Sequence, residues 1–466
     1  MRQALTMWIA RAAAGVLLGL ACVASAQAAD AKGGSDGVWR SRGYGIVAEV
    51  RGGRATYYDV TRAACLKRPN EPELSTALFD GAKVSPRGDQ LTVQSSWALT
   101  MLTFDRLDGL PASCAKAPAN PKDPVANFEV FWNTFNEHYA FFRERGVDWN
   151  EVGATYRAQI NGQTTDAELL EIFRKIFRQL QDDHVGLIAG RERVNAGYPS
   201  VLTRLGEAMS KRPASDHTSG AAALLKSSWD GYLDPGSIEL LGKHAAVGSA
   251  AKGAIGYAMI SAEEGEAADI DALFARFAGK RGLILDMRLN SGGDDRLGLA
   301  LAGSLTAQVR PGFSKCARDG DGFTPVQRTT VQPRPKAFSG PVVVLISPLN
   351  WSAGENFAMT IKDFPNVVVV GDRTGGVHSD TLIKYLPNGW RFTLSNEVFT
   401  APDGTTYETV GVPPDLLVPY DPEANLADGV DPQIEKALYL LGSDRFAELA
   451  AGAKRLPGRG RRSPCV

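Results

Sequence analysis

Hydrophobic and polar positions follow different patterns in successive parts of the chain. Between about residues 38 and 107, short alternating runs are broken by Gly and Asp, and two such runs, 45–50 and 55–60, flank an Arg-Gly-Gly-Arg sequence. This arrangement predicts a β-hairpin, and further strands are expected at 91–94 and 99–104. The region therefore predicts a small antiparallel β domain.

The next region has a helical pattern. Aromatic residues between 128 and 142 recur at three and four positions, which is the spacing of one helix face. Thr165-Asp166-Ala167-Glu168 is a capping box that predicts the start of a second helix, with apolar positions continuing to Leu180. Such an aromatic face could line a ligand groove, but packing in a core is the better interpretation.

From Gly256 onward, continuous apolar runs replace the alternation. Runs at 283–287, 342–346 and 367–370 are typical of strands that are buried on both faces. Strands that alternate with helices predict a mostly parallel sheet covered by helices. The helical stretches lie before and between these runs, at 265–279, 295–308 and 353–363.

Composition and charge narrow the function classes. The chain has 466 residues, of which 44% are hydrophobic and 22% are charged, as in a folded protein. Its formal net charge is −1, so we predict no nucleic-acid partner. The tail after Gly452 is basic and rich in Gly and Pro, and we expect a disordered end there.

Residues 1–28 have the features of a secretory signal peptide. Arg2 and Arg11 precede an apolar stretch of 12–24, and Ala-Gln-Ala then provides a small-residue cleavage site. The stretch is too short to span a membrane, which takes about 20 apolar residues. We expect an exported protein, periplasmic or secreted, without stable membrane insertion. An uncleaved anchor and lipidation at Cys22 are the alternatives.

Four cysteines remain after cleavage, and an even number in an exported protein favours disulfides. Cys65 and Cys114 are the preferred pair because both fall in the N-terminal domain, and Cys316 and Cys465 pair by elimination. Free buried thiols are the alternative. The sequence has no Cys-x-x-Cys pair, so a zinc site is disfavoured, and we expect no metal and no cofactor.

Three segments could carry chemistry. Ser352 lies between a predicted buried strand and a helix, where the N–H of Ala353 and the helix dipole would face an oxyanion, although Ser is most often only an N-cap there. Gly292-Gly293 follows another strand and could supply backbone N–H groups, or could be an ordinary turn. His184 ends the second helix and could act as a base, although a single His is more often structural.

Together these segments resemble the tricorn-like and C-terminal-processing serine peptidases, to which the interphotoreceptor retinoid-binding protein is related. The resemblance covers about 126–420. It implies a ClpP/crotonase-like catalytic core. The matching residues are Asp182-Asp183-His184-Val185, Gly256-Tyr257, Asp286-x-Arg288-x-Asn290-x-Gly292-Gly293, Ser352-Ala353-Gly354-Glu355, Gly371-Asp372-Arg373-Thr374-Gly375-Gly376 and Glu408-Thr409-Val410-Gly411-Val412-Pro413-Pro414-Asp415.

The resemblance also implies roles. Ser352 matches the family's nucleophile, His184 the base of the tricorn-like branch, and Glu408 a further member that orients the base directly or through a neighbour. The oxyanion donors would be the N–H groups of Ala353 and of Gly292 or Gly293.

The sequence departs from the family pattern at two positions. Val377 stands where the Ser–Lys branch has its Lys, which argues against a Ser–Lys dyad. Asp183 stands where the tricorn-type enzyme has a Ser, so the relay would differ in detail. His378 and Lys384 are alternative bases, and Lys384 is expected in a strand with its side chain exposed.

The expected organisation has six parts. The connecting segment is too short for a complete PDZ domain of about 90 residues, so none is expected. The parts are the signal peptide (1–28), the β domain with its proline-rich linker (29–118), the helical segment (119–190), the connecting segment (191–250), the catalytic α/β domain (251–422), and a C-terminal helix with a basic tail (423–466).

These observations predict an exported serine peptidase that hydrolyses peptide bonds of a peptide or protein substrate through a Ser-His-Glu site. An oligomer is possible. The main alternative is a non-catalytic protein on the same scaffold that binds a hydrophobic ligand or a peptide. An acyl-CoA enzyme of the crotonase type is a weaker alternative, because export argues against it.

Overall fold

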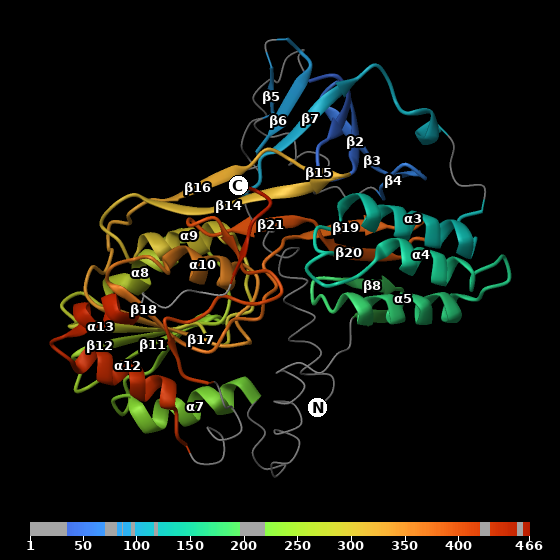
Figure 1. Ribbon diagram of the computed structural model, residues 1–466. Coiled ribbons are helices and arrows are strands. Elements are labelled where there is room, and N and C mark those ends of the chain that lie inside the picture. Colours follow the sequence, from blue (N-terminus) through green and yellow to red (C-terminus); the bar gives the residue numbers. More distant parts are fainter. Residues whose placement is uncertain are drawn as a thin grey trace.

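Figure 1 shows the computed structural model of the protein, which describes residues 35–69, 82–85, 87–94, 98–115, 120–195, 220–419, 429–453 and 460–466. The predicted signal peptide lies outside the described residues, and so does 196–219, part of the segment in which no complete PDZ domain is expected. An N-terminal antiparallel sheet, a helical segment and an α/β core are present, so the predicted fold class is confirmed.

The N-terminal domain is a seven-stranded sheet in which all paired strands are antiparallel. Gly52 and Gly53 have positive φ and form the turn of the predicted hairpin. Trp39, Leu91 and Phe104 are buried in its core. In sheet order, the strands are β4 (Cys65–Lys67), β3 (Arg54–Val60), β2 (Ile46–Arg51), β1 (Gly37–Ser41), β7 (Leu102–Leu107), β6 (Gln90–Val93) and β5 (Lys83–Val84).

The helical segment packs on a small four-stranded sheet. Thr165 and Glu168 form the predicted capping box at the start of α5. The aromatic face of α3 is core, as expected, and the Phe131 ring lies 4.5 Å from Phe173 of α5 and 5.5 Å from Phe392 of β20, between ring centroids. The elements are α3 (Pro124–His138), α4 (Trp149–Arg157) and α5 (Asp166–Leu180), over the sheet β19 (Thr381–Tyr385), β20 (Arg391–Ser395), β8 (Gly186–Ala189) and β9 (Glu192–Asn195).

The core is a second seven-stranded sheet whose pairs from β12 to β23 are parallel. The three predicted apolar runs are its central strands, buried on both faces. In sheet order, the strands are β10 (Glu239–Leu241), β11 (Ala245–Ala250), β12 (Ile255–Ile260), β13 (Gly282–Asp286), β17 (Val342–Ile346), β18 (Val367–Gly371) and β23 (Leu416–Leu417).

Helices cover both faces of this sheet (Figure 1). On one face, Phe274, Leu301 and Phe357 belong to a single apolar cluster. On the other, Ile434 and Phe446 do so. The first face carries α8 (Ala267–Ala275), α9 (Asp295–Gly303) and α10 (Ala353–Ile361), and the second carries α7 (Gly220–Tyr232), α12 (Pro432–Gly442) and α13 (Phe446–Ala453).

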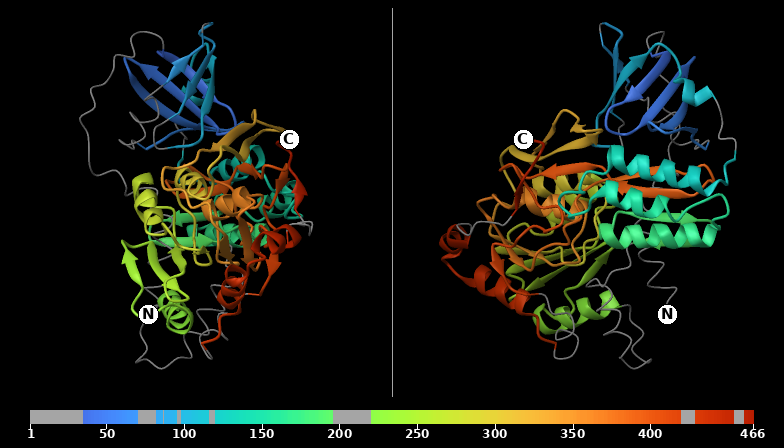
Figure 2. Two further views of the ribbon diagram at one scale, coloured as in Figure 1. Left: turned by 90° about the vertical axis from the view of Figure 1, so that its left-hand side faces the viewer. Right: turned by 45° about the vertical axis from the view of Figure 1, so that its right-hand side comes forward.

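A further small sheet connects the core to the N-terminal domain. Its longest strand is β14 (Arg310–Asp319), which pairs with β15 (Gly322–Phe323), β16 (Gln327–Val331) and β21 (Glu397–Thr400). Figure 2 shows that the N-terminal sheet lies directly above this region. The N-terminal domain therefore contacts a part of the chain that lies between Gly293 and Ser352 in sequence, and the Met101 N–H donates to the Gln327 side chain of β16 at 2.8 Å.

The end of the chain corrects one expectation. The basic tail was expected to be disordered, but Arg461–Arg462 form β24, which pairs with β22 (Thr405–Thr406). Cys465 forms a disulfide with Cys316 of β14, and this crosslink holds the last residues against the sheet. The other disulfide joins Cys65 and Cys114, so both pairs are those that the sequence favoured.

Candidate active site

Ser352 begins α10 but does not act as an N-cap. Its φ is 53° and its ψ is −127°, and its side chain makes no capping hydrogen bond. A non-glycine residue at positive φ is strained, and such strain is concentrated at functional sites. The turn therefore leaves the Ser352 hydroxyl available, which excludes the simpler N-cap interpretation.

The glycine pair lies against this serine. A Cβ on Gly292 would lie 2.6 Å from the Ser352 Cβ and 3.1 Å from the Ala353 nitrogen. The two loops are joined directly, since the Trp351 N–H donates to the Asn290 carbonyl at 2.9 Å. Ser352, Ala353 and Gly292 are thus brought together at the carboxyl ends of β13 and β17.

Two backbone N–H groups remain available beside Ser352. The Gly292 N–H donates to Asn290 Oδ1 at 2.8 Å and is occupied. The N–H groups of Gly293 and Ala353 have no acceptor among the described residues. Gly293 packs closely against the backbone of Glu263, because a Cβ added at Gly293 would lie 2.3 Å from the Glu263 carbonyl oxygen. Two free donors near a strained serine are the components of an oxyanion hole.

Glu355, which belongs to the serine motif, holds the neighbouring loop. Its fully buried carboxylate accepts from the Gly376 N–H at 2.7 Å, from the Val377 N–H at 2.8 Å and from the Thr374 hydroxyl. The Val377 carbonyl in turn accepts from the Ser352 N–H at 3.0 Å. Glu355 therefore positions the backbone that fixes the serine, and has a structural role at this site.

His184 lies between α5 and β8 and is half-buried. It interacts electrostatically with His378 and Asp380, and its carbonyl accepts from Thr393 of β20 at 2.8 Å. Its Nδ1 is buried and has no hydrogen-bond partner. Among the described residues, no hydrogen bond joins His184 to the Ser352 hydroxyl or to the Glu408 carboxylate.

Glu408 lies at the centre of a buried ionic cluster. Its carboxylate accepts from the His378 N–H at 2.8 Å and the Ser379 N–H at 3.3 Å, and it lies 3.2 Å from the Arg145 guanidinium. Burial raises the pKa of Glu408 to about 8, against the opposing effect of Arg145. Arg145 also lies 3.5 Å from Asp182, which precedes His184 by two residues. The cluster thus connects Glu408 to the turn that carries His184.

The two alternative bases have other contacts. His378 is buried, and its Nδ1 lies 3.1 Å from Asn356 Oδ1; burial lowers the pKa of its imidazole. Lys384 does lie in a strand, but the expectation of an exposed side chain was wrong. Its Nζ donates to Tyr44, Gly45 and Asp59 at 2.7, 2.9 and 2.7 Å. The N-terminal domain covers the face of β19 that would otherwise meet solvent.

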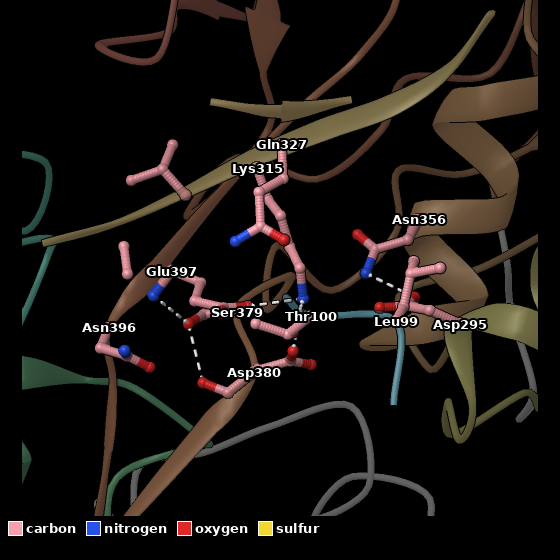
Figure 3. A network of polar contacts seen from close by, with 12 residues as sticks. Leu99, Thr100, Asp295, Lys315, Gln327, Asn356, Ser379, Asp380, Asn396 and Glu397 are labelled. Atoms are coloured by element: carbon pink, nitrogen blue, oxygen red, sulfur yellow. Dashed lines mark hydrogen bonds and ion pairs between the residues drawn. The ribbon is translucent and has the colours of Figure 1, made fainter. Parts of the chain in front are cut away.

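A buried lysine that the motifs did not include supports the segment after His378 (Figure 3). Lys315 of β14 lies 2.9 Å from both Asp380 and Glu397 and also donates to Thr100. These carboxylates raise its pKa, so it stays charged. Glu397 also accepts from Tyr44, so two residues of the N-terminal domain reach this network. Burial raises the pKa of Glu397 to about 7.

The described residues contain no group of three or more His, Cys, Asp or Glu residues arranged to hold a metal ion. None of their helices is both long enough and apolar enough to cross a membrane.

Comparison with family models identifies the class of protein. Residues 254–418 match peptidase family S41, and residues 121–178 match the tricorn protease C1 domain. The chain is therefore a serine-type peptidase. More particularly, its α/β core is similar to peptidase family S41 and its helical segment to the tricorn C1 domain, so the resemblance stated from the motifs is confirmed.

Solved structures agree with this fold. A candidate peptidase from Parabacteroides merdae is 26% identical, with a TM-score of 0.58 over 69% of this chain and 98% of that chain. Mature CPAF is 13% identical, with a TM-score of 0.52 over 71% of this chain and 98% of that chain, and shows a likeness of fold alone. Among curated proteins, no match to this sequence was found.

Proposed function

We propose that this chain is an exported peptidase in which Ser352 is the nucleophile and His184 is the general base. Glu408 orients His184 directly or through a neighbouring residue. The observation that carries the proposal is the strained turn at Ser352, with the uncommitted N–H groups of Gly293 and Ala353 beside it. The same turn would serve no purpose in a protein that used Ser352 only to cap α10.

In the proposed acylation step, His184 takes the hydroxyl proton of Ser352 as the oxygen attacks the peptide carbonyl. The carbonyl oxygen becomes an oxyanion, and the N–H groups of Gly293 and Ala353 donate to it. His184 then gives the proton to the leaving amine, and water releases the acyl group by the reverse sequence. The missing Ser352–His184 hydrogen bond is compatible with this scheme, because such bonds often tighten only when substrate is bound.

The test is intact mass after incubation with a fluorophosphonate, which esterifies activated serines. We expect one adduct per chain, lost in Ser352→Ala and slowed at least 100-fold in His184→Ala. Ser291→Ala is the matched control, since Ser291 lies on the adjacent loop, and it should label normally. No adduct on the unmodified chain would contradict the proposal and favour a binding protein on the same scaffold.

Export is part of the proposal and rests on the sequence of residues 1–28, together with two disulfides. Expression in a bacterial host with fractionation tests it. We expect a periplasmic or secreted product that has lost about 28 residues by mass. A full-length cytoplasmic product with five free thiols would contradict it.

A further inference from the structure

Arg145 occupies a position that none of the sequence motifs includes. It lies in the turn between α3 and α4, and its side chain is only 8% exposed. A buried guanidinium is costly unless carboxylates and hydrogen-bond acceptors surround it. Its partners therefore indicate what the burial achieves.

The partners of Arg145 are Glu408 and two residues of the turn that leads to His184. The guanidinium lies 3.2 Å from Glu408 Oε1 and 3.5 Å from Asp182 Oδ2, and it also donates to the Gln181 carbonyl. Gln181 has a φ of 50°, so the turn that leads to His184 is strained. Asp182 completes that turn by accepting from the His184 N–H at 2.9 Å.

We propose that Arg145 is a positioning residue of this peptidase, which fixes the His184 turn relative to Glu408 and favours the ionised form of the Glu408 carboxyl group. The inference rests on the proposed function, because it assigns Arg145 a part in the same Ser352–His184–Glu408 site. Arg145 acts through Asp182 and Glu408, the two residues that it joins.

The charges around Glu408 explain why a cation is needed there. Asp182 and Tyr139 face the carboxylate from the helical segment, Glu355 from α10, and His378 from the loop beside it. Burial, Asp182 and Glu355 all favour the protonated acid, and Arg145 is the one cation among these groups. Without Arg145, the neighbouring carboxyl groups of Asp182 and Glu355 would favour the protonated form of Glu408 with no cation among these groups to oppose them.

The experiment compares the pH dependence of kcat/KM in Arg145→Gln with that of the unmodified chain. An opposite charge this close lowers a carboxyl pKa by about 1–3 units, so its loss should move the acid limb at least one unit higher. The rate at pH 7 should then fall about 10-fold. Arg145→Lys should restore most of the limb, because it keeps the charge. The matched control is Arg143→Gln, an exposed arginine of the same turn.

A readout without turnover separates this inference from the proposed function. The imidazole 15N signals of His184, assigned with His184→Gln, should move in Arg145→Gln and not in Arg143→Gln. If Arg145→Gln does not fold, Arg145→Lys and the double variant Arg145→Gln/Asp182→Asn replace it. Unchanged His184 signals overturn the inference, whatever the chain's activity. So does an activity loss that is equal at every pH and is not rescued by Lys. An inactive unmodified chain with moved His184 signals would refute the proposed function alone.

Discussion

Different kinds of interaction hold the two halves of the proposed active site. The nucleophile half consists of Ser352, Ala353 and the glycine pair, held by backbone hydrogen bonds between two loops of one sheet. The base half consists of His184 and Glu408, which are connected through Asp182 and Arg145. Backbone hydrogen bonds fix the first half, with the buried Glu355 carboxylate holding the adjacent loop, whereas buried ion pairs hold the second half together.

This difference predicts different sensitivities. Backbone contacts tolerate no added volume but do not depend on pH, so the nucleophile half should respond to steric change. Buried ion pairs tolerate small shape changes but not the loss of one partner, because the other charge is then left uncompensated. Three variants test the contrast, from the largest expected effect to the smallest.

Removing the buried lysine should be the most damaging change. Lys315→Met leaves Asp380 and Glu397 facing each other without a cation and also removes the bond to Thr100 of the N-terminal domain. Breaking one partner of a buried pair costs about 3–5 kcal/mol of unfolding free energy. Urea unfolding measures it, with Lys226→Met as the control, since that lysine forms an exposed pair with Asp230. A loss of unfolding free energy below about 1 kcal/mol would show that the ion pairs of Lys315 do not stabilise this part of the fold.

Crowding the nucleophile should abolish most activity without a comparable loss of stability. Gly292→Ala places a methyl group 2.6 Å from the Ser352 Cβ and 3.1 Å from the Ala353 nitrogen. Disturbing an oxyanion donor lowers kcat about 10²–10³-fold. The control is Gly389→Ala, because Gly389 also has positive φ but has open space around it, so it reproduces the strain alone. Equal activities of the two variants would contradict a contact between Gly292 and the nucleophile.

The sequence predicted one half of the site better than the other, for a physical reason. Ser352, Gly292 and Gly293 are each recognisable locally, because a strand, a turn and a helix lie together in the chain. Arg145 and Lys315 gain their roles from partners at least 36 residues away, such as Gln181, Glu408 and Asp380. No local pattern marks such a residue as buried.

The same distinction applies to the fold. The central strands of the α/β sheet were predicted because continuous apolar runs indicate burial on both faces, and β13, β17 and β18 confirm them. The sequence did not indicate β14, whose Lys315 and Arg310 interrupt any simple pattern, and the strand is stabilised by pairing with β16 and β21. The ordered C-terminus was missed because a disulfide holds it, against the tendency of its composition.

The smallest predicted effect tests whether the Glu263 carboxyl group matters for the nucleophile half. Glu263 supports the glycine pair through its backbone, and burial raises the pKa of its carboxyl from 4.5 to about 8. The folded protein thus holds a proton between these pH values that the unfolded chain releases, so stability falls as pH rises through that window. Glu263→Gln removes this titration. Urea unfolding at pH 5.5, 7 and 8.5 should show that the loss of stability across this range is smaller by about 3 kcal/mol in the variant.

The matched control for that experiment is Glu192→Gln, since Glu192 is exposed on β9. Activity of Glu263→Gln at pH 7 should stay near that of the unmodified chain, because the backbone bonds of Glu263 to Gly292 and Asp294 do not involve the carboxyl group. A large activity loss at unchanged stability would mean that the nucleophile half also depends on a side-chain charge, and the division between the two halves would fail. A reduced slope with intact activity would place the pH sensitivity of catalysis in the Arg145–Glu408 half.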